Sequence, residues 1–307
     1  MRSFRFAVMA TRADSAAEWR AKARRIEELG YQVLLMPDHL SPQLAPVPAL
    51  MAALDATTTL RAGSFVFAND YRNPVMLAKE IATLDVLSGG RVEFGLGAGW
   101  ATRDYEMLGI PYDPPARRVD RLIEAARLID RLFTEDTVDS GGAHYPVRGA
   151  KLRPRPLQRP RPPVMIGGGG PRMLAFAARH ADIVALAPQV NADGQPKVAD
   201  LTTGATERKI ARLRTAAGTR FAALELNAIV FDAGVTDEPR TFLDAAATRM
   251  KAAITQVVDS PYFLYGALGD LRRQLLARRD RLGITYYAIP EKVMEPFAPL
   301  ARELRAL

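Results

Sequence analysis

The chain has 307 residues, of which 48% are hydrophobic and 25% are charged, and its formal net charge is +8. This composition is typical of a globular protein and excludes a disordered chain, while the absence of cysteine excludes a disulfide framework and a thiolate metal site. No apolar stretch approaches the roughly 18 residues that cross a bilayer, and residues 1–14 lack the apolar core of a signal peptide, so we expect a cytoplasmic protein with no membrane partner.

Apolar runs with strand character alternate with amphipathic helical runs through the first half of the chain. Ser15 and Glu18 have the spacing of a helix capping box, and Gly30 suits the residue that follows a helix end, so a helix is predicted between them. The elements predicted for this half are strands over 4–9, 31–36, 60–68 and 91–98 and helices over 15–30, 48–57, 74–88 and 116–133.

The same alternation resumes after a predicted hairpin over 137–148. The elements predicted here are strands over 163–168, 182–187, 221–231 and 284–290 and helices over 171–180, 205–217, 237–255, 269–281 and 292–305. Eight strands, each followed by a helix, predict a parallel sheet closed into a (β/α)8 TIM barrel, as one α/β domain over residues 1–307. An open doubly wound sheet is the alternative, although no G-x-G-x-x-G motif follows the first strand.

The working face of such a barrel is formed by the C-terminal ends of its strands. This rule selects Pro37, Asp38 and His39 after the second strand, Ala68 and Asn69 after the third, and Gly97, Ala98, Gly99 and Trp100 after the fourth. These residues are therefore the first candidates for a binding or catalytic site.

Four glycines, Gly167 to Gly170, join the fifth strand to a helix in the segment "VMIGGGGPRM". Bare backbone at a helix N-terminus exposes N–H groups at the positive end of the helix dipole, which favours an anion. Pro171 suits the first helical turn and Arg172 adds a positive charge, so a phosphate is the predicted occupant. The alternative is that the glycines only turn a tight corner.

The most basic segment is "RGAKLRPRPLQRPRPPV", residues 148–164, in which arginines and a lysine alternate with prolines. It contains no aromatic side chain on which a base could stack, and no other nucleic-acid motif occurs in the chain. We therefore interpret it as a structural connection and expect no nucleic-acid partner.

The three histidines occupy different settings. His180 ends a predicted helix, where a positive charge is favoured, and His144 lies in the predicted hairpin. Only His39 is predicted at the mouth of the barrel, where an imidazole can donate a proton near neutral pH. The three do not have the spacing of a zinc site, so no metal is expected.

Several longer motifs resemble the bacterial luciferase-like family, and within it the actinobacterial-type oxidoreductases that use coenzyme F420. They are "PDHL", "YRNPVMLAKEIATLDVLSGGRVEFGLGAGW", "HYPVRG" and "PPVMIGGGGPRMLAFAARHADIV". The resemblance implies a TIM barrel with coenzyme F420, or alternatively FMN, across its C-terminal mouth and the cofactor phosphate at the glycine-rich loop.

The resemblance also implies roles for single residues. Asp38 and His39 match positions beside the reactive ring edge, and Phe65 and Val66 match a bulged strand with a non-prolyl cis peptide, the exact bond being left open. The other cofactor contacts that it implies are Ala68, Asn69, Gly97, Ala98, Gly99, Arg103, Gly168, Gly169, Gly170, Arg172 and Met173. Substrate contacts are left to the loops 38–50, 188–204 and 256–268.

One position departs from the related sugar-phosphate dehydrogenases, which carry a proton-donating glutamate where this chain has Trp100. Trp100 favours an apolar or aromatic small-molecule substrate, or serves only as packing. We expect an F420-dependent oxidoreductase, acting as a homodimer, in which hydride transfer is assisted by His39 as proton donor, oriented by Asp38. The alternatives are an FMN-dependent monooxygenase and a non-catalytic barrel that binds a flavin or deazaflavin.

Overall fold

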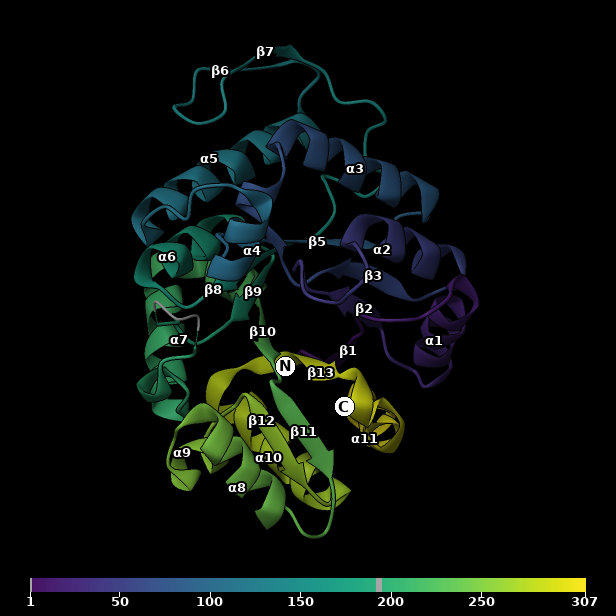
Figure 1. Ribbon diagram of the computed structural model, residues 1–307, viewed down its shortest axis with the longest axis vertical. Coiled ribbons are helices and arrows are strands. Elements are labelled where there is room, and N and C mark those ends of the chain that lie inside the picture. The colour runs from purple at the N-terminus through teal and green to yellow at the C-terminus, as the bar shows by residue number, and fades with distance from the viewer. Residues whose placement is uncertain (1, 192–194) are drawn as a thin grey trace. The chain divides into compact units, whose positions relative to one another are not determined.

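The computed structural model describes residues 2–191 and 195–307 (Figure 1). The expected substrate loop over 188–204 therefore includes three residues, 192–194, that lie outside the described residues. By their contacts, the described residues divide into two compact units, one within 1–10, 25–35 and 168–307 and the other within 11–24 and 36–167.

Eight parallel strands, with the two-residue strand β4 (Phe67–Ala68) added beside β5, form the sheet that defines the fold. The eight are β1 (Arg5–Met9), β2 (Val33–Met36), β3 (Arg61–Ser64), β5 (Val92–Gly97), β8 (Val164–Gly168), β9 (Ile183–Leu186), β10 (Glu225–Ile229) and β13 (Ile284–Pro290). Their hydrogen-bonded order is β3-β2-β1-β13-β10-β9-β8-β5, and β3 pairs again with β5, which closes the ring. The predicted (β/α)8 barrel is confirmed, and an open doubly wound sheet is wrong.

Helices follow the strands as the hydrophobic periodicity predicts. They are α1 (Ala16–Glu28), α2 (Pro46–Asp55), α3 (Pro74–Leu87), α4 (Thr102–Leu108), α5 (Pro115–Thr134), α6 (Pro171–His180), α7 (Thr203–Ala217), α8 (Arg240–Met250), α9 (Ile254–Val258), α10 (Leu268–Leu282) and α11 (Met294–Arg305). At the start of α1 the Ser15 hydroxyl accepts a hydrogen bond from the Glu18 amide at 3.1 Å, and Gly30 has a φ of 88°. The Ser15 half of the predicted capping box and the Gly30 signal are confirmed, whereas the Glu18 carboxylate accepts a hydrogen bond from the Asp14 amide, at 2.8 Å, and not from that of Ser15.

Five departures from the predicted elements occur. The strand expected over 60–68 is two short strands, β3 and β4, interrupted at Phe65 and Val66. The helix expected over 237–255 is two helices, α8 and α9, because Lys251 adopts a left-handed φ of 53°. The strand expected over 221–231 begins only at Glu225, after a 3-10 helix over Gly218–Ala223. The seven-residue helix α4 and the parallel pair β11 (Asp232–Val235) and β12 (Phe263–Gly266) were not predicted. Elements this short give no clear periodicity.

The segment between β10 and β13 builds a small core together with Leu201, which precedes α7. In Figure 1, α8 and α9 lie beside β11 and β12 at the yellow-green end of the chain. The buried side chains of this core are Leu201, Ala246, Ala247, Val257, Tyr262, Phe263 and Tyr265. The predicted hairpin is present as the antiparallel pair β6 (Val138–Ser140) and β7 (Val147–Ala150), next to α5 in Figure 1.

The basic segment 148–164 behaves as a structural connection. Its arginines find local partners: Arg155 forms an ion pair with Asp136 at 2.8 Å, and Arg161 with Asp130 at 2.5 Å. The peptide bonds before Pro154 and Pro160 are cis. No helix in the described part of the chain combines the length and apolar character that a bilayer crossing requires.

Candidate functional site

Asp38, which follows β2, fastens two loops to each other. Its buried carboxylate accepts hydrogen bonds from the Arg72 guanidinium at 2.5 and 3.0 Å and from the Ala68 amide at 3.0 Å. Ala68 ends the short strand β4 (Phe67–Ala68), and the Arg72 guanidinium lies 5.0 Å from the centre of the Phe67 ring. The contacts of Asp38 therefore hold the loop after β2 against the end of β4.

His39 has a different partner from the one expected. Its Nδ1 lies 2.6 Å from Oδ2 of Asp104, a residue of α4 that is only 4% exposed. The same carboxylate accepts hydrogen bonds from the Tyr71 hydroxyl at 3.2 Å and from the Leu40 amide at 3.3 Å. The expectation that Asp38 orients the imidazole is wrong: Asp104 does so, while the carboxylate of Asp38 is occupied by an arginine and a backbone amide.

The hydrogen bond to Asp104 fixes which imidazole nitrogen can act. A carboxylate accepts hydrogen bonds, so Nδ1 of His39 carries the proton between them and Nε2 is the other available nitrogen. Burial, and then the charge of Asp104, raise the pKa of Tyr71, so its hydroxyl remains a donor. The arrangement resembles an imidazole held in one tautomer by a buried carboxylate, as general acid–base chemistry requires.

Trp100 lies at the edge of this histidine. The two ring centres are 5.2 Å apart and the ring planes meet at 79°, so the contact is edge-to-face. Trp100 is 45% exposed, and Leu40 is also exposed on the neighbouring loop. The imidazole therefore has an apolar, solvent-accessible surface beside it and no carboxylate at position 100.

Buried Arg118 of α5 shapes the loop that follows β5. Its guanidinium donates hydrogen bonds to the carbonyl oxygens of Ala98 at 3.2 Å and Asp113 at 2.9 Å, and also to that of Gly99. A fourth bond reaches the hydroxyl of Tyr112 at 3.2 Å. The side chain of Arg118 therefore binds the loop between β5 and α4 at two of its carbonyl oxygens.

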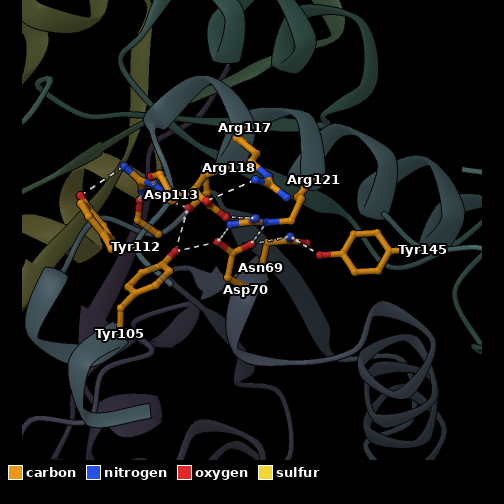
Figure 2. Close-up of polar contacts among 11 residues, drawn as sticks. Asn69, Asp70, Tyr105, Tyr112, Asp113, Arg117, Arg118, Arg121 and Tyr145 are labelled. Carbon is orange, nitrogen blue, oxygen red and sulfur yellow. Dashed lines mark hydrogen bonds and ion pairs between the residues drawn. The ribbon is translucent and has the colours of Figure 1, made fainter. Parts of the chain in front are cut away.

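Asp70 is the centre of a second set of contacts to the same loop (Figure 2). Its carboxylate accepts hydrogen bonds from the Arg121 guanidinium at 2.9 and 2.6 Å and from the Tyr105 hydroxyl at 3.0 Å. The Tyr105 hydroxyl also lies 3.3 Å from the Ala98 carbonyl oxygen, and Arg121 continues to Asp113. The segments after β4 and β5 are therefore connected to α5 by one continuous network.

The glycines at the end of β5 have packing reasons in the protein itself. A Cβ added at Gly97 would lie 2.6 Å from Val66 Cγ2, and one at Gly99, whose φ is 74°, would overlap the Tyr105 hydroxyl. The peptide bond between Phe65 and Val66 is cis, as the family resemblance implies for this segment. Val66 covers the bare backbone of Gly97.

Asn69 uses one end of its amide in the protein's own network. Its Nδ2 donates hydrogen bonds to Asp70 at 3.2 Å and to the Tyr145 hydroxyl at 2.9 Å, which leaves Oδ1 as an acceptor. Tyr145 is held in turn by Glu124 of α5, which accepts hydrogen bonds from the amides of Tyr145 at 2.6 Å and His144 at 3.0 Å. The β6–β7 hairpin thus orients Asn69, a connection that the sequence does not reveal.

The N-terminus of α6, in the other unit, has the form of an anion site only at its last glycine. A Cβ at Gly169 would overlap the Ala187 carbonyl oxygen, and one at Gly167 would lie 3.2 Å from Val66 Cγ2. Gly170, the residue before α6, would place a Cβ in open space, and no side chain caps this helix. Packing therefore explains Gly167 and Gly169, whereas Gly170 leaves the helix N-terminus accessible.

The remaining predicted residues are placed as follows. Gly168, Arg172 and Met173 lie beside Gly170 around the start of α6, where a Cβ at Gly168 would meet Met173 Cβ at 3.3 Å. Arg103 is an exposed residue of α4, and the described residues give it no polar partner. His180 ends α6, stacked 4.5 Å from Phe176, as expected for a structural histidine.

Comparisons with known proteins bear on this geometry. The family described as luciferase-like monooxygenase matches residues 2–230. An F420-dependent glucose-6-phosphate dehydrogenase of Amycolatopsis mediterranei (strain U-32) is 33% identical over 171 residues, 52% of this chain and 50% of that protein. An FMNH(2)-dependent dimethylsulfone monooxygenase of Pseudomonas putida is 30% identical over 131 residues, 43% of this chain and 36% of that protein.

The solved structure of an F420-dependent secondary alcohol dehydrogenase in complex with an F420-acetone adduct has the same fold, with a TM-score of 0.78 at 17% identity over 97% of this chain and 98% of that chain. The chain spans about half the length of the curated dehydrogenase that it matches. Because the family match covers most of the residues, including both segments that carry the candidate site, the chain belongs to the luciferase-like monooxygenase family.

Proposed function

We propose that the protein is an F420-dependent oxidoreductase that transfers a hydride between the deazaflavin and a small organic substrate with an apolar or aromatic body. The observation that carries the proposal is the pair formed by His39 and the buried carboxylate of Asp104, with Trp100 against the imidazole edge. The curated dehydrogenase named for coenzyme F420 supports the choice of cofactor.

Two groups of residues, each taken within its own unit, fit the chemistry of this cofactor. The uncapped start of α6 at Gly170 offers backbone N–H groups at the positive end of a helix, beside the side chain of Arg172, as a phosphate requires. In the other unit, Asn69 offers an amide oxygen, which accepts a hydrogen bond from the ring N–H that a deazaflavin carries. These residues would hold the phosphate and the ring edge, respectively.

Coenzyme F420, when bound, supplies a two-electron hydride donor or acceptor. The chain's own part is to hold and move the proton that must accompany the hydride. Asp104 keeps the Nδ1–H of His39 toward itself, so Nε2 is the atom that gives a proton to, or takes one from, a substrate heteroatom. The exposed faces of Trp100 and Leu40 exclude water beside that atom and receive the apolar part of the substrate.

The apolar surface also distinguishes this site from one for a sugar phosphate. The indole of Trp100 has one N–H donor and no acceptor for the several hydroxyl groups of a sugar, and a polar group left unpaired costs free energy on binding. Trp100 therefore favours ketones, imines or activated alkenes with an apolar body over glucose 6-phosphate, the substrate in the name of the curated relative.

A second candidate function, an FMN-dependent monooxygenase, is favoured by the relative from Pseudomonas putida that is named for FMNH(2). Calorimetric titration of the purified protein with F420 and with FMN separates the two. We expect tighter binding of F420, followed by oxidation of reduced F420 with an apolar carbonyl substrate under anaerobic conditions. Tighter binding of FMN with oxygen-dependent turnover would establish the monooxygenase instead, and binding without turnover of any substrate would leave a binding protein.

A further inference from the structure

A cavity of about 180 Å³ opens at the N-terminal ends of β10 and β13. Leu224 and Gly283, which line it, directly precede these two parallel strands. It is separate from the α6 N-terminus of the same unit, which follows the C-terminal end of a strand. Its volume is several times the roughly 30 Å³ that one water molecule occupies in the liquid, so it has room for a small organic molecule.

Three arginines line the cavity, and no acidic side chain does. Arg2 is fixed by hydrogen bonds from Nη2 to the carbonyl oxygens of Ala222 at 3.2 Å and Ala223 at 2.5 Å. The Arg214 guanidinium lies 4.9 Å from the centre of the Phe221 ring. These contacts use a minority of the five N–H donors that each guanidinium carries.

Of the three arginines, Arg279 alone has a carboxylate partner among the described residues. Its Nε lies 3.3 Å from Oδ1 of Asp280, an exposed residue outside the cavity, and its guanidinium lies 5.3 Å from the centre of the Phe4 ring. Among the described residues, one exposed carboxylate thus pairs with one of the three guanidinium groups, which leaves a net positive charge at the cavity.

A buried hydroxyl gives independent evidence of an unfilled hydrogen-bonding site. Thr285 lines the cavity and is only 3% exposed, and its Oγ1 is buried with no hydrogen-bond partner among the described residues. A buried hydroxyl without a partner costs free energy, so such groups are normally satisfied by water or a ligand.

Helix electrostatics explain only part of this arrangement. Arg214 and Arg279 lie in the last turns of α7 and α10, where a positive side chain is favoured by the helix dipole. That effect accounts for neither the convergence of Arg2 on the same cavity nor the unpartnered hydroxyl of Thr285. Both follow if the cavity holds an anion.

We propose that this cavity is a second binding site, for a small organic anion with a short apolar chain. The charged group, a carboxylate or a phosphate monoester, lies among Arg2, Arg214 and Arg279, and rotation of the Thr285 side chain about χ1 brings its hydroxyl to the same group. The apolar chain packs against Phe221 and Leu226, which form part of the uncharged lining. The site is independent of the proposed redox function.

The test compares butyl phosphate, pentanoate, inorganic phosphate and butanol by calorimetric titration of the full chain. An anionic head and an apolar tail are both needed, so we expect butyl phosphate or pentanoate to bind at least about tenfold more tightly than inorganic phosphate or butanol. Whichever of the two anions binds more tightly identifies the head group. No binding of either anion at millimolar concentration would overturn the proposal.

Substitutions of the lining residues show where the anion binds. R214Q combined with R279Q should weaken the preferred anion at least about tenfold, and T285V should weaken it without unfolding the chain. R212Q, which removes an exposed arginine from α7 outside the cavity lining, is the matched control and should bind as the wild type does. Equal affinity in the double variant and the control would show that the anion sits elsewhere, for example at the α6 N-terminus.

The melting temperature without ligand gives a second readout. If the arginines form an anion site, relief of their mutual repulsion should offset the lost helix-end and ring contacts, so the ligand-free double variant should melt at about the wild-type temperature. A lower melting temperature together with unchanged anion binding would assign these arginines to the helix ends alone and overturn the proposal.

Discussion

His39 and Asp104 are 65 positions apart in the sequence, yet Nδ1 of the imidazole lies 2.6 Å from a carboxylate oxygen of Asp104. Asp104 lies in α4, a helix of seven residues that follows the loop after β5. The network of Arg118 and Tyr105 holds this loop at the carbonyl oxygens of Ala98 and Gly99. The orientation of the imidazole therefore depends on contacts that begin on α5.

The substitution D104N tests whether this carboxylate orients a working histidine. The amide keeps the size of the side chain but can offer a donor to Nδ1, which favours the wrong tautomer. We expect kcat for an identified substrate to fall at least about tenfold, with cofactor affinity nearly unchanged. The measurement is the single-turnover rate of reduced F420 oxidation across pH 5 to 9.

The double variant H39Q with D104N distinguishes positioning from general damage. If Asp104 acts through His39, its substitution should cost almost nothing further once the imidazole is gone, because residues that act as a unit are not additive. Additive losses, or a pH profile of H39Q that coincides with the wild type, would contradict the proton-delivery role of His39.

Asp38 should behave differently, because its contacts fasten the backbone. The substitution D38N leaves the guanidinium of Arg72 without its carboxylate partner in a largely buried site. Removing one member of a buried ion pair costs about 3 kcal/mol of the free energy of unfolding, which urea denaturation measures. The single-turnover rate of D38N should depend on pH as the wild-type rate does. If the rate no longer rose or fell over part of the pH range in which the wild-type rate does, Asp38 would take part in proton transfer.

The sequence predicted the barrel because its signals are local. Strand and helix periodicities, the Ser15 cap and Gly30 each need only a few neighbouring residues. The segment "DVLSGGR", part of the longest motif that resembles the family, stabilises the fold rather than the candidate site. Its Arg91 donates hydrogen bonds to the carbonyl oxygens of Leu54 at 2.7 Å and Leu60 at 2.9 Å, and so holds the loop between α2 and β3 in place.

The site was predicted only in outline. The rule that strand ends carry function selected Asp38, His39 and Trp100, which lie after β2 and β5, but it could not pair His39 with Asp104. That pairing depends on a short helix and on long-range packing, neither of which leaves a periodic pattern. The same holds for the hydrogen bond from Asn69 to Tyr145, which requires the β6–β7 hairpin to be held by Glu124.

Two neighbouring glycines separate phosphate binding from folding. G170V puts a side chain in open space in front of the α6 N–H groups, so it should lower the affinity for F420 about tenfold or more and leave the melting temperature unchanged. G169V forces a side chain onto the Ala187 carbonyl oxygen and should lower the melting temperature instead. Calorimetric titration and thermal denaturation of both variants, with R172A alongside, provide the check. Unchanged F420 affinity in folded G170V and R172A would show that the glycines only form a turn and do not bind the phosphate.

Trp100 is the residue on which the proposed substrate class depends. W100E places a carboxylate beside His39, on the surface that the apolar part of the substrate should contact. We expect F420 affinity to stay within about threefold of wild type, while kcat/KM for apolar carbonyl substrates falls at least about tenfold, since a charge desolvated by an apolar ligand is costly.

Two further variants serve as controls for W100E. W100F should retain most of the wild-type kcat/KM, because it keeps an aromatic surface. M107E is the matched control, since Met107 is also an exposed apolar residue and lies on α4. If M107E and W100E lower kcat/KM equally, charge near α4 is responsible and Trp100 does not contact the substrate. If W100E instead gains turnover of glucose 6-phosphate, the residue at position 100 selects between the two substrate classes.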